Sequence, residues 1–298
     1  MNNPFIQDLK NQYKNGSILI KLIFINVAVF LLVNVIGSLL YLFNISNGVA
    51  IFISWFALPA DLSELVVKPW TLLSYMFLHQ GLFHMLMNMM VLYFGSQIFN
   101  QFLNEKKLLN VYLLGGLSGG LLYVMAFNLF PVFEANVTNS VALGASAAVM
   151  AVLIAAATYV PNFVVRLMFI GNVKLKYIAM GYLVLDVVRI QSSNSGGHIA
   201  HIGGAIFGFF FIQQLKKGND FTLGFSRFLN YLKAMFQPQK KMKVVYKKQG
   251  KTKSNTAYNS QKVDNQKKVD LILDKISKSG YDSLSAEEKA ILFDASKK

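Results

Sequence analysis

The chain has 298 residues, of which 54% are hydrophobic and only 14% are charged, whereas a typical soluble domain has about 25% charged residues. This composition argues against a soluble globular protein. The absence of cysteine excludes disulfide frameworks, thiolate nucleophiles and cysteine-ligated metal sites. Most of the net charge of +15 lies beyond residue 215, where 19 of the 29 basic and 8 of the 14 acidic residues are found. We expect an apolar membrane body whose basic tail meets anionic lipid head groups, with nucleic acid as the weaker alternative.

Six apolar segments are predicted to be membrane helices, since a bilayer core about 30 Å thick requires about 20 residues. They lie at about 20–43, 76–99, 107–130, 141–160, 177–192 and 199–215. The fifth is the least regular, because Lys174 and Lys176 crowd its start. Asp186, near its end, is expected to cap this helix or to pair with Arg189. Residues 1–19 contain no evident signal-peptide cleavage site, so the first span is expected to remain in the mature protein.

The positions of Lys and Arg in the short connections predict the orientation of the spans. Basic residues precede the first span, follow the second and fourth spans, and fill the tail. In the first-to-second connection Lys68 is the only basic residue, and the third-to-fourth connection has none. Both termini are therefore predicted to be cytoplasmic, and a bacterial inner membrane is the expected location.

The tail is predicted to contain a basic flexible linker at 217–268 and a small helical cytoplasmic module at 269–298. Apolar residues after Val269 fit one helix that Gly280 can end, and Ser285 to Glu288 has the spacing of a capping box that begins a second. A partly ordered cytoplasmic tail fits the same composition equally well.

The four histidines all fall at predicted spans, His79 and His84 at the second and His198 and His201 at the sixth. Polar side chains at membrane depth are costly and tend to be functional. Asn88 follows His84 by about one helical turn, so one face of the second span presents two polar side chains.

Gly204 and Gly208 follow His201 at helical spacing and leave a groove that a neighbouring helix can approach closely. The expected neighbour is 142–157, in which 10 of 16 residues are Ala, Gly or Ser. Its hydroxyl, on Ser146, lies near a helix start, where free backbone N–H groups can bind an oxyanion. Because an imidazole can take the proton of a hydroxyl, Ser146 and His201 are candidates for a catalytic dyad.

Each of these residues also has a structural explanation. A lone serine in a membrane helix usually bonds to its own turn, and Asn88 alone more often joins two helices. His198 can bond to a carbonyl at the end of its span, and His79 is expected to anchor the first loop. The glycine-rich run 115–120 is interpreted as helix packing. It is the coincidence of polar residues in three separate spans that favours a functional site.

Three segments resemble the rhomboid family of intramembrane serine proteases, and the resemblance covers residues 20–215. His79-Gln80-Gly81-Leu82-Phe83-His84-Met85-Leu86-Met87-Asn88 is similar to the His and Asn pattern of the second span, and Gly144-Ala145-Ser146-Ala147 is similar to the Gly-X-Ser-Gly of the fourth. Ala200-His201-Ile202-Gly203-Gly204-Ala205-Ile206-Phe207-Gly208 matches the sixth-span Ala-His-X-X-Gly-X-X-X-Gly. The resemblance implies an all-α membrane protein in which a six-span bundle at 20–216 cleaves transmembrane protein substrates.

The resemblance also implies the roles of individual residues. Ser146 is the expected nucleophile and His201 its general base, while the side chains of His84 and Asn88 and the backbone N–H of Ser146 hold the oxyanion. Neither a cofactor nor a metal ion is implied. The family has no obligatory acidic third member, and no carboxylate at the matching depth is obvious in this sequence. Helix packing next to the site is expected of Gly144, Gly204 and Gly208.

Three positions depart from the family pattern. Ala147 replaces the glycine that usually follows the serine, so packing against His201 is expected to change. Thr71 replaces an arginine found in many bacterial members, and Phe99 lies near the position of a glutamate that ties down the first loop. These departures affect the expected rate and gating more than the reaction class.

Two other functions stay open on the sequence. A non-catalytic protein of the same fold would bind membrane-spanning segments for quality control or trafficking. A metal transporter would use the four histidines, but it would usually add carboxylates within the spans, where Asp186 is the one candidate.

Overall fold

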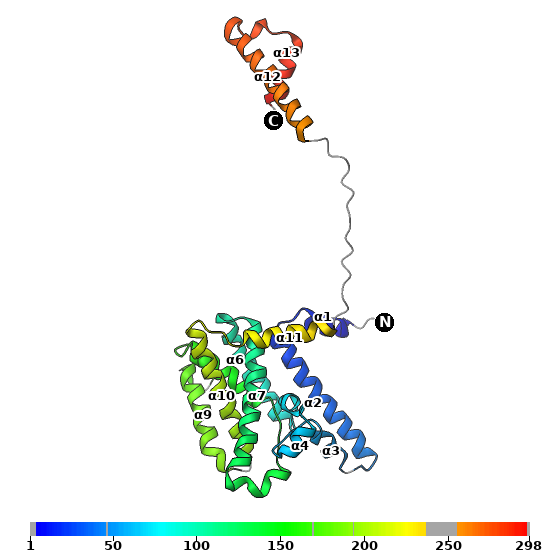
Figure 1. The fold of residues 1–298 in the computed structure, drawn as a ribbon, viewed down its shortest axis with the longest axis vertical. Coiled ribbons are helices and arrows are strands. Elements are labelled where there is room, and N and C mark those ends of the chain that lie inside the picture. The colour runs from blue at the N-terminus through cyan, green and yellow to red at the C-terminus, as the bar shows by residue number, and fades with distance from the viewer. Residues whose placement is uncertain (1–3, 46, 169, 193, 237–254, 297–298) are drawn as a thin grey trace. The chain divides into compact units, whose positions relative to one another are not determined.

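The computed structural model describes residues 4–45, 47–168, 170–192, 194–236 and 255–296, and it divides into two compact units, Met1–Gln237 and Pro238–Lys298. Regular structure in the first unit is almost entirely helical (Figure 1). Four of its helices are long and apolar enough to cross a membrane: α2 (Ile18–Leu42), α6 (Leu82–Phe102), α7 (Glu105–Leu129) and α10 (Ser195–Lys216).

The remaining two predicted spans are helical but short. The helices α8 (Ser146–Tyr159) and α9 (Leu175–Val188) have 14 residues each. At 1.5 Å per residue, such a helix is about 21 Å long, less than the thickness of the bilayer core. By length and composition the described helices therefore provide four spans, and the six-span count stays a prediction.

The second and fourth predicted spans begin later than expected, because other backbone structures precede them. Before α6, residues Thr71–Ser74 form α5 and Tyr75–Phe77 form the 3₁₀ helix η1. Before α8, strand β2 (Val141–Ala142) pairs antiparallel with β1 (Leu58–Pro59). A strand at this position removes the first residues of the predicted fourth span from the helix.

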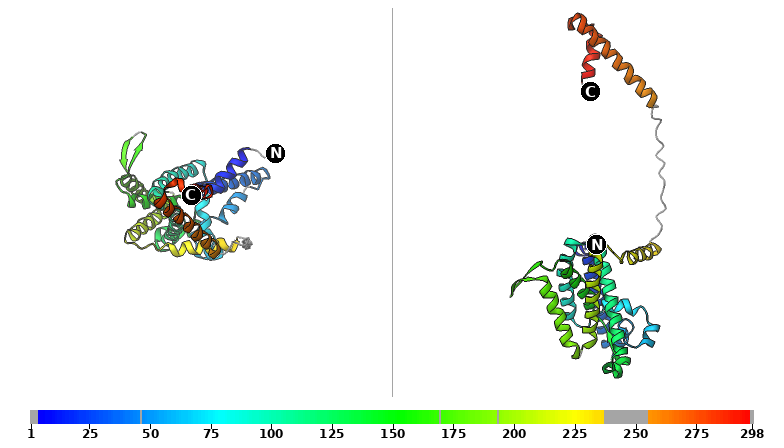
Figure 2. Two further views of the ribbon diagram at one scale, coloured as in Figure 1. Left: turned by 90° about the horizontal axis from the view of Figure 1, so that it is seen from above. Right: turned by 60° about the vertical axis from the view of Figure 1, so that its left-hand side comes forward.

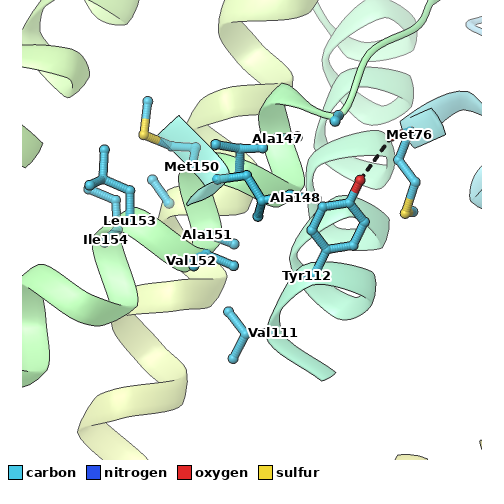
Figure 3. Packing of buried hydrophobic residues seen from close by; sticks show 14 of the residues in the cluster. Met76, Val111, Tyr112, Ala147, Ala148, Met150, Ala151, Val152, Leu153 and Ile154 are labelled. Atoms are coloured by element: carbon cyan, nitrogen blue, oxygen red, sulfur yellow. Dashed lines mark hydrogen bonds between the residues drawn. The ribbon is translucent and has the colours of Figure 1, made fainter. Parts of the chain in front are cut away.

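Small residues allow α7, α8 and α10 to pack together at the centre of the first unit. A Cβ atom at Gly204 would overlap the backbone carbonyl of Ala147, and one at Gly208 would overlap that of Ala151. On α7, a Cβ atom at Gly115 would likewise overlap the side chain of Ala151. Figure 3 shows the alanine side chains of α8 in this core and the hydrogen bond from Tyr112 Oη to the carbonyl of Met76 (3.3 Å).

We predict that Gly204→Val separates α8 from α10 and strongly destabilises the protein, by about 3 kcal/mol or more, because a backbone carbonyl cannot give way to the new side chain. The matched control is Gly181→Val in α9, where an added Cβ atom meets no heavy atom within 4 Å. Thermal unfolding in detergent compares the two variants. Equal losses in both would show that helix propensity, and not close packing, limits position 204.

The segment between α2 and α6 is braced by aromatic and backbone contacts. It contains α3 (Gly48–Ser54) and α4 (Leu62–Val67). The rings of Trp55 and Trp70 stack with centroids 6.2 Å apart, and Trp70 Nε1 donates to the carbonyl of Trp55 at 2.7 Å. Thr71 Oγ1 donates to the carbonyl of Lys68 at 2.6 Å, and Ser74 Oγ donates to that of Phe56 at 2.7 Å. This loop therefore keeps several polar contacts although position 71 is a threonine and not the arginine of many bacterial family members.

A β-hairpin connects α8 to α9. Strand β3 (Val164–Leu167) pairs antiparallel with β4 (Gly171–Lys174), with Val164 opposite Lys174 and Arg166 opposite Asn172. Figure 2 shows the hairpin projecting from the helices. Its two strands carry Arg166 and Lys174, two of the basic residues on which the predicted orientation rests.

A polar cluster joins the start of α7 to the segment after α10. Lys107 Nζ lies 3.1 Å from Asp220 Oδ2. Asn110 Nδ2 donates to Thr222 Oγ1 at 3.0 Å and to Ser226 Oγ at 2.7 Å. These contacts hold the beginning of α11 (Leu223–Phe236) against α7, so part of the predicted linker 217–268 is a docked helix.

Burial raises the pKa of Asp220, but hydrogen bonds from Thr222 and the contact with Lys107 outweigh it, so the pKa lies below its ordinary value of 3.8. A depressed pKa in the folded state contributes stability above the unfolded pKa, and that stability is lost as the pH falls through the folded pKa.

We therefore predict that Asp220→Asn lowers the free energy of unfolding by about 1 kcal/mol at neutral pH. Thermal unfolding in detergent, repeated in stepwise acid, should show the difference from the parent shrinking as Asp220 becomes protonated. Glu64→Gln, which breaks the more exposed pair with Lys68, is the control. A difference that persists unchanged in acid would contradict the ion pair as its cause.

The second unit consists of α12 (Asn255–Ser279), the 3₁₀ helix η4 (Tyr281–Ser283) and α13 (Ala286–Ser296). Gly280, with φ of +77°, follows α12. The predicted capping box is present, because Glu288 Oε2 accepts from Ser285 N at 2.7 Å and Ser285 Oγ accepts from Glu288 N at 3.2 Å. The first helix begins at 255 and not near 269, so residues 255–268 are helix and not linker. Residues 237–254 lie outside the described residues.

Candidate functional site

Ser146 is the first residue of α8, and its position depends on the glycine two residues earlier. Gly144 has φ of +131°, a conformation that side chains rarely adopt, and its N–H donates to the carbonyl of Tyr75 at 2.9 Å. A Cβ atom at Gly144 would lie 3.0 Å from His84 Cε1 and 3.6 Å from Ser146 Oγ. The absence of that atom leaves room for the imidazole and the hydroxyl on either side of residue 144.

Ser146 opens into a cavity of about 250 Å³ between the helices. Polar side chains from four helices line it: His84 and Asn88 of α6, Ser146 of α8, Asp186 of α9, and His198 and His201 of α10. The N–H groups in the first turn of a helix lack partners within the helix, so α8 brings backbone donors as well as a hydroxyl to this place. The structure thus gathers all four residues predicted to act in catalysis around one cavity.

The hydroxyl and the imidazole of the predicted dyad share the cavity without a hydrogen bond. No hydrogen bond between Ser146 and His201 occurs among the residues that the structure describes. Both residues lie on helices whose backbones approach closely at Gly204 and Ala147. The structure therefore places the two groups in one site, and their direct contact stays a prediction.

Asp186 binds both histidines of α10. Its Oδ1 atom lies 2.8 Å from His198 Nδ1 and 2.8 Å from His201 Nδ1. The expectation that Asp186 caps its helix or pairs with Arg189 is therefore wrong, as is the expectation of a carbonyl partner for His198. No carboxylate was expected at the depth of His201 either, and Asp186 occupies that place. Asp186 and His201 are 15 residues apart, and the packing of α9 against α10 brings them together.

The second oxygen of Asp186 is buried without a partner. The residue is 5% exposed, and Oδ2 makes no hydrogen bond to any of the described residues. Buried polar atoms are rarely left in this state. This oxygen therefore has capacity for a proton or a ligand that the described residues do not provide.

The two predicted oxyanion ligands of α6 differ in their surroundings. Asn88 is buried, and its Nδ2 donates to the carbonyl of His84 at 3.0 Å. One N–H of this amide is thus used within the helix and the second remains for a ligand. His84 packs edge-to-face against His79, with ring centroids 5.2 Å apart. His79 precedes α6, which begins at Leu82, and its ring supports that of His84.

The remaining two departures from the family pattern are accommodated by packing. Ala147 faces two glycines, since a Cβ atom at Gly119 would overlap its side chain and one at Gly204 would overlap its carbonyl. Phe99 is 1% exposed and belongs to the apolar core of the first unit. It therefore stabilises the bundle from within and provides no polar tie to the first loop.

The match to known families agrees with this arrangement. A family model described as Rhomboid domain matches residues 67–217, just over half of the chain. The chain therefore belongs to the rhomboid family. A second model, described as a family of unknown function (DUF6576), matches residues 255–298 and coincides with α12 to α13.

Three mammalian proteins described as presenilin-associated rhomboid-like protein, mitochondrial, are similar to the chain. Those of Bos taurus, Mus musculus and Homo sapiens are each 33% identical to it over 144 residues, which is 46% of this chain and 35% of the relative. The chain thus spans about a third of the length of the curated relatives it matches.

Proposed function

We propose that this rhomboid is a serine endopeptidase that cleaves membrane-spanning proteins, with Ser146 as the nucleophile and His201 as the general base. The observation that carries the proposal is the cavity in which Ser146, at the start of α8, meets His201, whose other side is bound by Asp186. A serine in this setting lies beside both a base and free backbone donors, and this combination is what acyl transfer requires.

Asp186 supports the tautomer that catalysis needs. A neutral imidazole carries one proton, and a carboxylate at 2.8 Å from Nδ1 favours the proton on that nitrogen. The lone pair of His201 is then on Nε2, where it can accept the proton of the Ser146 hydroxyl. After proton transfer, the same carboxylate stabilises the imidazolium. Asp186 is thus proposed as a positioning residue that acts through His201.

The reaction follows from these roles. Ser146 Oγ forms a bond to the substrate carbonyl carbon while His201 Nε2 takes the hydroxyl proton. The peptide C–N bond then breaks as His201 returns that proton to the leaving amine, and an acyl-enzyme remains. Water, deprotonated by His201, attacks the ester carbonyl. The ester C–O bond then breaks as His201 returns that proton to Ser146 Oγ, and the product with the new carboxyl group leaves.

The oxyanion of this reaction has candidate donors on two helices. The backbone N–H of Ser146 and the side chains of His84 and Asn88 are the proposed ligands, as expected for the family. Preorganised donors of this kind typically contribute about 10²–10³ in rate each. Transmembrane proteins are the proposed substrates, and anionic lipids are proposed to bind the basic tail. A bacterial inner membrane gains no support from the relatives, whose names place them in mitochondria.

A non-catalytic rhomboid-like binder is the second candidate, and it is favoured by the absence of a hydrogen bond between Ser146 and His201 among the described residues. Such a protein would retain the cavity and bind membrane-spanning segments without cutting them. Labelling of the full chain with a fluorophosphonate separates the two functions. A label that depends on Ser146 supports the protease, and an unlabelled, folded protein supports the binder.

We predict that Ser146→Ala abolishes cleavage of a co-reconstituted single-span protein and leaves thermal unfolding close to the parent, because it removes one oxygen and no packing contact. Ser38→Ala is the matched control, since Ser38 Oγ bonds to the carbonyl of Asn34 in its own helix at 2.9 Å. Gel analysis of the products measures both variants. Retained cleavage in Ser146→Ala would overturn the proposed nucleophile.

We predict that Asp186→Asn lowers kcat by about 10²–10⁴ with little change in KM, since an amide can hold His201 in the wrong tautomer. Asp186→Glu, which keeps the charge, should recover part of the loss. The pH–rate profile of Asp186→Asn distinguishes a positioning role from a structural one, because a change in packing alone lowers the rate equally at every pH. A uniformly lowered profile, or full activity, would contradict the role assigned to Asp186.

A further inference from the structure

Two imidazoles and a carboxylate converge at the cavity in a manner that the dyad does not require. His198 Nδ1 and His201 Nδ1 both lie 2.8 Å from one oxygen of Asp186, and a ligand atom from each of the three residues lies within 4.8 Å of the other two. The two rings are nearly perpendicular, with centroids 5.8 Å apart. Catalysis as proposed uses one of these imidazoles, and His198 has no role in it.

The unpartnered oxygen of Asp186 is an independent indication of a ligand. Asp186 is 95% buried, yet its Oδ2 makes no hydrogen bond among the described residues, while Oδ1 serves both histidines. The side chains of His198 and His201 remain 13% and 19% exposed, and all three residues line the cavity. A small ion in the cavity therefore meets both imidazoles, and the buried carboxylate lies directly behind them.

We propose that Asp186, His198 and His201 bind a divalent transition-metal ion, of which zinc is the best fit, and that the bound ion switches off the proposed protease. Two imidazole nitrogens and one carboxylate oxygen are a donor set that zinc uses, with a fourth position left for water. Ligands about 2.1 Å from a tetrahedral ion lie about 3.4 Å apart, so the 2.8 Å contacts need to lengthen by about 0.6 Å. The effect on activity rests on the proposed function, whereas binding does not.

Metal binding and general-base catalysis by His201 are mutually exclusive. When Nδ1 of a neutral imidazole is bound to a metal ion, the ring proton is on Nε2. His201 Nε2 is then a donor and cannot accept the proton of Ser146. The Nδ1–H···Oδ1 hydrogen bond from His201 to Asp186 is then lost, because the metal ion occupies the place of that proton. Inhibition should therefore be reversed by a chelator, since no bond of the protein is broken.

The chemistry of the donors predicts selectivity. Imidazole nitrogen suits zinc and other later first-row metals, whereas magnesium and calcium prefer sites made of oxygen atoms. Zinc should therefore bind and inhibit at concentrations at which magnesium has no effect. Equal binding of both ions would indicate non-specific attraction to carboxylates and would overturn the proposed site.

The first test measures zinc binding to the full chain carrying Ser146→Ala, by isothermal titration in detergent, so that proteolysis is irrelevant. We expect one zinc ion per chain, and at least a tenfold weaker affinity when His198→Gln is added. His79→Gln is the matched control, because His79 lies outside the cluster and should leave the affinity unchanged. No saturable binding, or equal affinity with and without His198→Gln, would overturn the site.

Cobalt provides a second measurement that needs no substitution within the cluster. Cobalt bound by nitrogen and oxygen ligands in a four-coordinate site gives a strong visible absorption, and zinc should displace it in a one-to-one titration. If the chain carrying Ser146→Ala alone showed no such absorption, the proposed site would be overturned. This conclusion holds even if the His198→Gln variant fails to fold.

The final test measures cleavage of the single-span substrate by the chain with Ser146 intact. We expect zinc to remove at least 90% of the metal-free activity, a chelator to restore it, and His198→Gln to lose at least tenfold in sensitivity to zinc relative to its own metal-free rate. Zinc binding without any proteolysis would refute the proposed protease and leave the metal site standing. Proteolysis that is insensitive to bound zinc would overturn the switch.

Discussion

The close approach of α8 and α10 is the contact on which the rest of the first unit depends. At Gly204 and Gly208 the backbone of one helix lies against the carbonyl groups of the other, with no side chain between them. This close contact between the two helices places His201 beside the cavity that Ser146 opens into. A larger residue at either glycine would push α10 away from α8. The imidazole of His201 would then move away from the hydroxyl of Ser146, although both side chains would still be present.

The polar residues of the site are arranged around one carboxylate. Asp186 accepts from His198 and His201 through a single oxygen, while its other oxygen lacks a partner among the described residues. Because it lies at the contact of α9 with α10, Asp186 is proposed to favour a proton on Nδ1 of His201. The same geometry supports a general base when a proton occupies Nδ1 and a metal site when an ion does. The proposed activity and its proposed inhibition thus depend on what occupies Nδ1 of His201.

The parts outside the bundle are more structured than a basic tail requires. The cluster of Lys107, Asp220 and Thr222 docks the start of α11 on α7, and the capping box at Ser285 begins the last helix. The second unit coincides with its own family match, separate from the Rhomboid domain match. A tail that only attracted lipid head groups would need charge but no such specific contacts.

The sequence by itself determined the class of protein and most of the residues of the candidate site. Apolar runs, a small-residue segment containing Ser146, and polar residues at helical spacing are local features, so periodicity reveals them. The capping box at 285–288 was predictable for the same reason. Only the tertiary structure decided the partner of Asp186, the start of α6 at Leu82 and the helix across 255–268. The contact of Asp186 with His201 arises because α9 packs against α10 where both residues line the same cavity. The helix across 255–268 is exposed where its side chains are described, so no apolar periodicity marks it in the sequence.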